Sequence, residues 1–154
     1  MAVERMEHIG IVVEDLPAAT AFFLELGLVT QGNTRVNGEW VDRINGLKGV
    51  DAEITMLSTP DGEGTVELAK YHAPPGPENH TELPANAPGL RHLLFRVDDL
   101  DDTLARLQNR GAALVGEVEQ YEDMYRLCYI RGPEGIIVEL AEKLEQNQAV
   151  TSHG

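Results

Sequence analysis

Apolar residues recur along the chain in two alternating patterns, one typical of strands and one typical of helices. Residues 7–13 form a short run rich in β-branched side chains. The next segment has apolar residues at helical spacing: Leu16, Ala19, Phe22, Phe23 and Leu26. This order predicts a strand followed by a helix. Asp15 is placed to cap that helix, with Pro17 in its first turn and Gly27 at its end.

The remaining elements follow the same order in both halves of the chain. In the first half, strands are predicted at 52–58 and 64–71, joined at the Asp61-Gly62 turn. In the second half the predicted elements are a strand at 90–97, a helix from about Asp99 to Arg110, and strands near 112–119, 124–131 and 136–141. Each half is read as a strand, a helix and three more strands, although only two of those three are assigned in the first half, and this order predicts an α+β fold of two βαβββ modules.

Proline marks the boundary between the two modules. The stretch 72–89 holds five of the eight prolines and is typical of an extended linker. Apolar periodicity is lost in the last dozen residues. The predicted organisation is a first module at 1–71, a linker at 72–89, a second module at 90–142 and a C-terminal tail at 143–154.

The two halves also repeat short sequences that contain a histidine or a glutamate. The segment His8-Ile-Gly-Ile-Val-Val-Glu-Asp-Leu returns as His92-Leu-Leu-Phe-Arg-Val-Asp-Asp-Leu. The tetrapeptide Val-Glu-Leu-Ala occurs at 66–69 and again at 138–141, each time after a Pro-acid-Gly turn. Imidazoles and carboxylates bind first-row divalent metals, so the repeat predicts a metal site made by both copies.

Strand parity places the four repeated polar residues on equivalent faces. Successive side chains of a strand point to opposite faces, so His8, Glu67, His92 and Glu139 all oppose the main apolar stripe of their strands. Taken singly, each residue has a plain alternative as a structural histidine or a solvated glutamate. Taken together they favour a metal site, because an unpaired carboxylate in an apolar strand is costly.

Charge and composition exclude several classes of partner. Lys and Arg number 12 against 26 Asp and Glu, a net charge of -14, so nucleic acid and anionic membrane surfaces are not expected partners. No apolar stretch approaches the roughly 18 residues of a membrane span. The single cysteine, Cys128, suits a reducing compartment and predicts a cytoplasmic protein.

The motifs together resemble those of the vicinal oxygen chelate superfamily. They are His8-Ile-Gly-Ile-Val-Val-Glu-Asp-Leu, Val66-Glu67-Leu68, Leu90-Arg91-His92-Leu-Leu-Phe-Arg-Val-Asp-Asp-Leu and Gly132-Pro-Glu-Gly-Ile-Ile-Val-Glu139-Leu. The superfamily includes glyoxalase I, methylmalonyl-CoA epimerase, extradiol dioxygenases, fosfomycin-resistance proteins and bleomycin-binding proteins. The resemblance covers residues 7 to about 142. It implies a homodimer and two βαβββ modules that pair into a curled sheet around one metal cavity.

By the same resemblance, one divalent ion (Ni, Co, Zn, Fe or Mn) is bound by His8, Glu67, His92 and Glu139. Dioxygenases and fosfomycin-resistance enzymes use two histidines and one glutamate, so Glu67 favours the isomerase and lyase members. The leading hypothesis is a glyoxalase-like lyase or isomerase, in which Glu139 or Glu67 removes a proton next to a metal-chelated carbonyl of a small-molecule substrate. Three alternatives stay open: a methylmalonyl-CoA-type thioester epimerase, an Fe(II) extradiol-type dioxygenase and a non-catalytic protein that binds drug-like molecules.

Three further residues are candidates for substrate binding. Arg96 shares the face of His92 and is suited to a substrate carboxylate, and Arg126 offers a second guanidinium. Trp40 lies in a segment, 37–46, that matches no motif and is expected to hang over the cavity. The competing interpretations are a surface ion pair for each arginine and an exposed or interfacial aromatic for Trp40.

Overall fold

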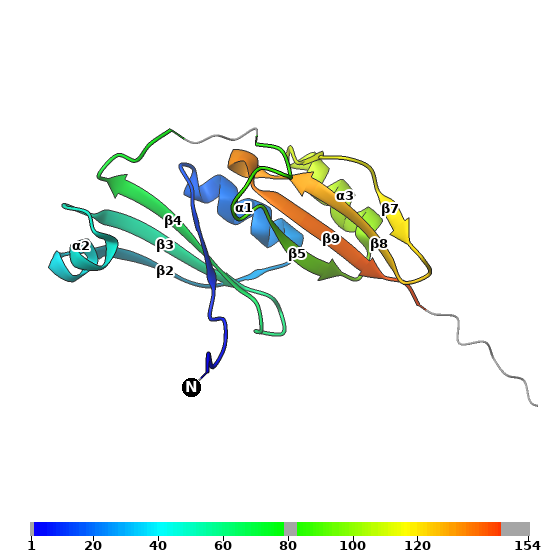
Figure 1. The fold of residues 1–154 in the computed structure, drawn as a ribbon, viewed down its shortest axis with the longest axis horizontal. Coiled ribbons are helices and arrows are strands. Elements are labelled where there is room, and N and C mark those ends of the chain that lie inside the picture. The colour runs from blue at the N-terminus through cyan, green and yellow to red at the C-terminus, as the bar shows by residue number, and fades with distance from the viewer. Residues whose placement is uncertain (1, 79–82, 146–154) are drawn as a thin grey trace, which may run out of the picture. The chain divides into compact units, whose positions relative to one another are not determined.

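A computed structural model of the protein describes residues 2–78 and 83–145 (Figure 1). The chain divides into two compact units between residues 80 and 81. Each unit contains one sheet and the helices that pack on it, which confirms the α+β class and the two βαβββ modules. Part of the predicted linker, 79–82, and the tail from 146 onward lie outside the described residues. None of the helices in the described ranges is long and apolar enough to cross a membrane.

The first unit is built on a four-stranded sheet. Its elements are β1 (Ile9–Val12), α1 (Leu16–Leu26), β2 (Val29–Asn37), α2 (Glu39–Asn45), β3 (Asp51–Ser58) and β4 (Thr65–Ala73). The strand order is β1-β4-β3-β2, with β1 parallel to β4 and the other pairs antiparallel. The two ends of the module thus lie beside each other in the sheet, because β1 and β4 are neighbours.

Helix α1 has the ends that its sequence predicts. The Asp15 side chain accepts a hydrogen bond from the backbone N–H of Ala18 at 3.0 Å, and Pro17 lies in the first turn. At the other end Gly27 adopts a φ of 121° and donates to the carbonyls of Phe23 and Leu24. The apolar face of α1 is buried, as its spacing predicts; its buried residues are Leu16, Ala19, Phe22, Phe23 and Leu26.

The second unit repeats this plan, with two short strands, β6 and β7, in the place of the long β2. Its elements are β5 (His92–Val97), α3 (Leu100–Asn109), β6 (Ala113–Leu114), β7 (Glu119–Tyr121), β8 (Tyr125–Arg131), a 3-10 turn at Pro133–Gly135 and β9 (Ile137–Lys143). The main strand order is β5-β9-β8-β6, with β5 parallel to β9. Asp99 caps α3 by accepting from the backbone N–H of Asp102.

The sequence prediction was wrong about the strand at 112–119. The chain bends at Val115 and Gly116, so only β6 and β7 pair with β8 as strands, and the chain leaves the sheet after Val115. A continuous run of small and β-branched residues predicts a strand. In the structure the bend interrupts this strand just past Val115, whose backbone N–H still donates to the Tyr129 carbonyl.

Helix α2 was also missed by the sequence analysis. It buries Val41 against Val50 and Ala52, on the face of the first sheet that also bears Glu67. The Asp42 carboxylate accepts from the backbone N–H groups of Gly49 and Val50, and these bonds lower its pKa. A helix of 7 residues that buries a single apolar side chain is too short for periodicity to reveal.

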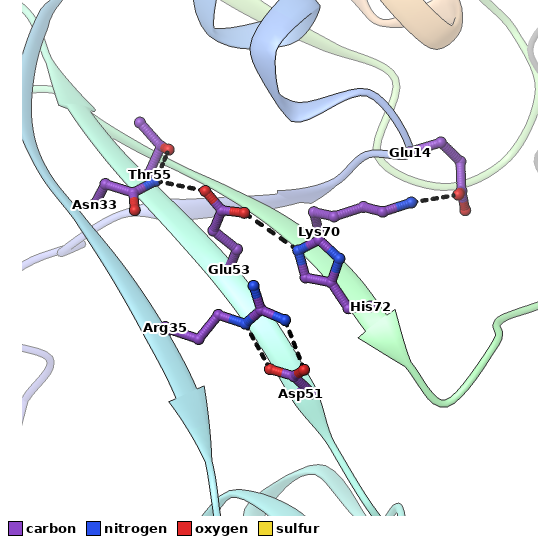
Figure 2. A network of polar contacts seen from close by, with 8 residues as sticks. All are labelled: Glu14, Asn33, Arg35, Asp51, Glu53, Thr55, Lys70 and His72. Atoms are coloured by element: carbon purple, nitrogen blue, oxygen red, sulfur yellow. Dashed lines mark hydrogen bonds and ion pairs between the residues drawn. The ribbon is translucent and has the colours of Figure 1, made fainter.

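The other face of the first sheet has a network of polar side chains beyond the part that α1 covers (Figure 2). Arg35 donates twice to Asp51, at 2.7 Å each. Glu53 accepts from Asn33 at 3.1 Å and lies 3.2 Å from His72. These paired charges stabilise a solvent-accessible sheet surface.

Candidate metal centre

In the first unit, strand pairing brings His8 and Glu67 together. His8 directly precedes β1, and Glu67 lies in β4, the parallel neighbour of β1. The register sets Glu67 opposite Gly10, two residues beyond His8 and on the same face. Nε2 of His8 is 2.9 Å from Oε2 of Glu67, and the two side chains remain 40% and 25% exposed. An imidazole and a carboxylate therefore meet on an accessible sheet face.

In the second unit, His92 and Glu139 form the equivalent pair. His92 begins β5, and Glu139 lies in the parallel strand β9 opposite Leu94, again two residues beyond the histidine. Nε2 of His92 is 3.3 Å from Oε1 of Glu139, with side-chain exposures of 37% and 16%. The two units thus repeat one local arrangement, down to the register of the strands.

The strand faces are those that parity predicts. Leu68 and Leu140, the neighbours of the two glutamates in sequence, are fully buried on the opposite face of each sheet. The helices α1 and α3 contact β4 and β9 on that buried side. Taken unit by unit, the residues that the structure describes contain no group of three or more metal-binding side chains. Each unit supplies one imidazole and one carboxylate.

Sequence reasoning missed Tyr129, which contacts both members of the second pair. Tyr129 lies in β8 opposite Glu139. Its side chain shares the face of the Glu139 carboxylate, within reach of a hydrogen bond. Its ring centroid is 4.9 Å from that of His92, with the planes tilted by 34°. Burial, and then the neighbouring Glu139 carboxylate, raise the pKa of Tyr129 above its ordinary value.

Counting residues outward from the predicted turn between the last two strands would have identified this tyrosine as the residue opposite Glu139. The Pro133-Glu134-Gly135 turn connects β8 and β9, and the register pairs residues equally distant from Glu134. In the first unit, the Asp61-Gly62 turn connects β3 and β4, and the residue opposite Glu67 is Met56. The two pairs therefore differ in the neighbour of the glutamate.

The three candidate substrate-binding residues lie in different places. Arg96 is exposed in β5, on the same face as His92. Arg126 lies on the opposite face, where its guanidinium bonds Asp101 of α3 at 2.9 and 3.0 Å and lowers the pKa of that carboxyl. Trp40 lies in α2 and is 60% exposed. Strand parity separates the two arginines. Arg126 and Tyr129 are three residues apart in β8, so the Arg126 side chain points away from the face that Tyr129 shares with Glu139.

Comparison with known proteins identifies the family. The model of the glyoxalase/bleomycin resistance protein/dioxygenase superfamily matches residues 5–140. The chain belongs to this superfamily. The resemblance noted from the sequence motifs is thereby confirmed, and it extends over both units.

Several related proteins match this chain over nearly its whole length. A glyoxalase family protein from Bacillus cereus, known from its crystal structure, is 47% identical with a TM-score of 0.90, over 94% of this chain and 97% of that one. The uncharacterized protein YwbC of Bacillus subtilis is 28% identical over 91% of this chain and 98% of its own. YaeR of Escherichia coli, also uncharacterized, is 28% identical over 93% and 99%.

A more distant member shows the fold with a bound metal. A mutant of the fosfomycin resistance protein FosX from Listeria monocytogenes was crystallised with Mn(II) and 1S,2S-dihydroxypropylphosphonic acid. It has a TM-score of 0.59 and 13% identity, over 90% of both chains. At that identity the likeness concerns the fold alone.

Proposed function

We propose that the protein is a metal-dependent lyase or isomerase of the glyoxalase type. The observation that carries this proposal is the repeated pair: a histidine at the start of one strand faces a glutamate on its parallel neighbour, in each unit. The two pairs together supply two imidazoles and two carboxylates. We propose His8, Glu67, His92 and Glu139 as ligands of one divalent ion.

The chemistry of the donors fits such an ion. Neutral imidazole and carboxylate are the ligands preferred by Fe(II), Co(II), Ni(II), Zn(II) and Mn(II). In each pair a nitrogen and an oxygen lie 2.9–3.3 Å apart, close enough for both to approach a common cation. Both glutamates are partly accessible, so a cation from solution can reach them.

In the proposed reaction each site residue has a separate role. A bound divalent ion would polarise the substrate carbonyl and favour loss of the neighbouring proton. Glu139 or Glu67 accepts that proton at a carboxylate oxygen and delivers it to the adjacent carbon in an isomerisation. His8 and His92 would serve only as ligands of that ion. Arg96, exposed on the face of His92, binds an anionic group of the substrate.

Delivery of the proton to the same carbon from the other side would make the protein an epimerase, the near alternative. A different class, a non-catalytic binding protein, is favoured by one comparison. TnmS3 of Streptomyces, an antibiotic-binding protein, has the same fold with a TM-score of 0.60 at 21% identity. We prefer the enzyme because both units of this chain carry an intact His–Glu pair.

Solvent exchange tests the proposal directly. The protein, loaded with Co(II), Ni(II), Zn(II) or Mn(II), is incubated in D2O with a hemithioacetal and with a 2-methylmalonyl thioester. We expect deuterium to be incorporated at the carbon next to the carbonyl. This exchange should stop when a chelator removes the metal ion. Oxygen uptake with a catechol, together with no exchange on either carbonyl substrate, would replace this function with ring cleavage.

A further inference from the structure

The two His–Glu pairs match in register but not in their surroundings. The residue opposite Glu139 is Tyr129, and the residue opposite Glu67 is Met56. A phenol donates a strong hydrogen bond to a carboxylate, whereas a thioether has no hydrogen to donate. The two units therefore differ at the position opposite the glutamate, which is itself a proposed metal ligand in each unit.

Tyr129 contacts both side chains of its pair. Strand β9 lies between β5 and β8, so Glu139 has His92 on one side and Tyr129 on the other. The tyrosine lies directly opposite the glutamate, with its hydroxyl within reach of the carboxylate, while its ring lies against the imidazole at 4.9 Å. One side chain thus restrains the rotamers of two neighbours. Consistent with this, Glu139 is less exposed than Glu67, at 16% against 25%.

We propose that Tyr129 is a positioning residue that fixes Glu139 and His92 as the preorganised half of the metal site and leaves Glu67 as the more mobile carboxylate. This inference rests on the proposed metal-dependent function. A carboxylate held by a neutral donor keeps one oxygen directed at the cation, and less rotamer entropy is lost when the cation binds. Glu67, without such a donor opposite it, is better suited to leave the cation and take a proton.

Metal titration of the full chain tests the role of Tyr129. Co(II) binding is followed by calorimetry and by the visible d–d spectrum, which reports ligand geometry. Removing a hydrogen bond to a metal ligand weakens metal binding by roughly 10- to 100-fold, so we expect Tyr129→Phe to lower Co(II) affinity about tenfold and to change the spectrum. The matched control is Tyr125→Phe, which removes a hydroxyl from the same face of β8, opposite Lys143. It should leave both readouts unchanged.

A second comparison separates the two glutamates. Glu139→Gln should weaken Co(II) binding more than Glu67→Gln, because it removes the ligand that Tyr129 orients. In the Tyr129→Phe background this difference should narrow. Such coupling would not arise if Tyr129 only stabilised the fold, and circular dichroism verifies that each variant is folded.

The possible results separate the positioning role of Tyr129 from the proposed metal-dependent function on which it rests. If the folded wild type binds no Co(II), the metal-dependent function and the role of Tyr129 both fail. If the wild type binds Co(II) but Tyr129→Phe matches it in affinity and spectrum, the metal site stands and the positioning role is overturned. Equal losses for Glu139→Gln and Glu67→Gln would likewise overturn it.

Discussion

Nε2 of His8 lies 2.9 Å from Oε2 of Glu67, although His8 directly precedes the first strand of the unit and Glu67 lies in its last strand. The parallel pairing of β1 with β4 makes them neighbours. His92 and Glu139 meet in the same way through β5 and β9. A module that closes its sheet with its own two ends delivers one imidazole and one carboxylate to a single face.

The first prediction concerns metal content. Protein purified without chelator should carry about one divalent ion per chain, because each unit contributes only one histidine and one glutamate to the proposed ligands. Elemental analysis measures this ratio, and His92→Ala should reduce it. Two ions per chain would mean that each pair binds metal independently. No ion, and no binding of Ni(II), Co(II), Zn(II) or Mn(II) on titration, would favour the non-catalytic binding protein.

Substitution of Glu67 separates proton abstraction from dioxygen chemistry. Glu67→Gln should retain part of the metal binding, because an amide oxygen still ligates, but it should change turnover strongly, since one candidate base is lost. The assay is deuterium exchange on a hemithioacetal and on a 2-methylmalonyl thioester.

Glu67→Ala provides the contrasting case. A ring-cleaving dioxygenase needs only His8, His92 and Glu139 as a facial triad. It would therefore keep Fe(II) and most of its oxygen uptake with a catechol in this variant. Such a result would contradict the lyase or isomerase proposal.

The two arginines should behave differently when replaced. Arg96 lies on the face of the proposed site, so Arg96→Ala should raise KM for an anionic substrate roughly tenfold, the loss expected for a charged hydrogen bond. Arg126 is paired with Asp101 on the opposite face. Arg126→Ala should therefore lower Tm slightly and leave KM unchanged. A large KM effect for Arg126→Ala alone would show that substrate binding had been assigned to the wrong face of the sheet.

Acid should destabilise the first unit through the network of Figure 2. The hydrogen bond from Arg35 lowers the pKa of Asp51, and those from Asn33 and His72 lower the pKa of Glu53. A carboxyl whose pKa is lowered by folding stabilises the native state above its unfolded pKa, roughly 4, and this contribution is lost as the pH falls through the folded pKa.

Thermal melts measure this effect. Between about pH 7 and pH 3.5 the Tm of Asp51→Asn should fall less than that of the wild type, because the variant has already lost the contribution. Glu117→Gln, which changes an exposed loop carboxyl, is the matched control and should follow the wild type. An equal decrease in Tm for all three proteins would show that the network does not contribute to the pH dependence.

We also expect a homodimer. The strand β2 ends the first sheet, and one of its edges pairs with no other strand of the described residues, so a second copy is suited to cover it. Sedimentation at micromolar concentration should give about twice the chain mass of 16.9 kDa. A mass equal to that of one chain would exclude stable dimers at this concentration.

Local patterns in the sequence predicted the elements that bury a regular stripe. The helix α1, with Asp15 and Gly27 at its ends, and the strands that carry Glu67 and Glu139 were predicted because each has a clear period and a terminating residue. The faces of those strands followed from alternation alone. Where the period is interrupted, as at Val115 and Gly116, or where an element buries one side chain, as in α2, a local pattern had nothing to repeat.

The sequence by itself determined the two-module plan, the family and the four repeated polar residues, since these depend on residue identity and spacing along the chain. Only the tertiary structure decided which residues are neighbours across strands. It set Glu67 two residues beyond His8 in register, brought the Tyr129 ring against His92, and turned Arg126 toward Asp101. The physical reason is that the pairing of strands far apart in the sequence is fixed by long-range packing, which no local pattern records, whereas a hairpin takes its register from its turn.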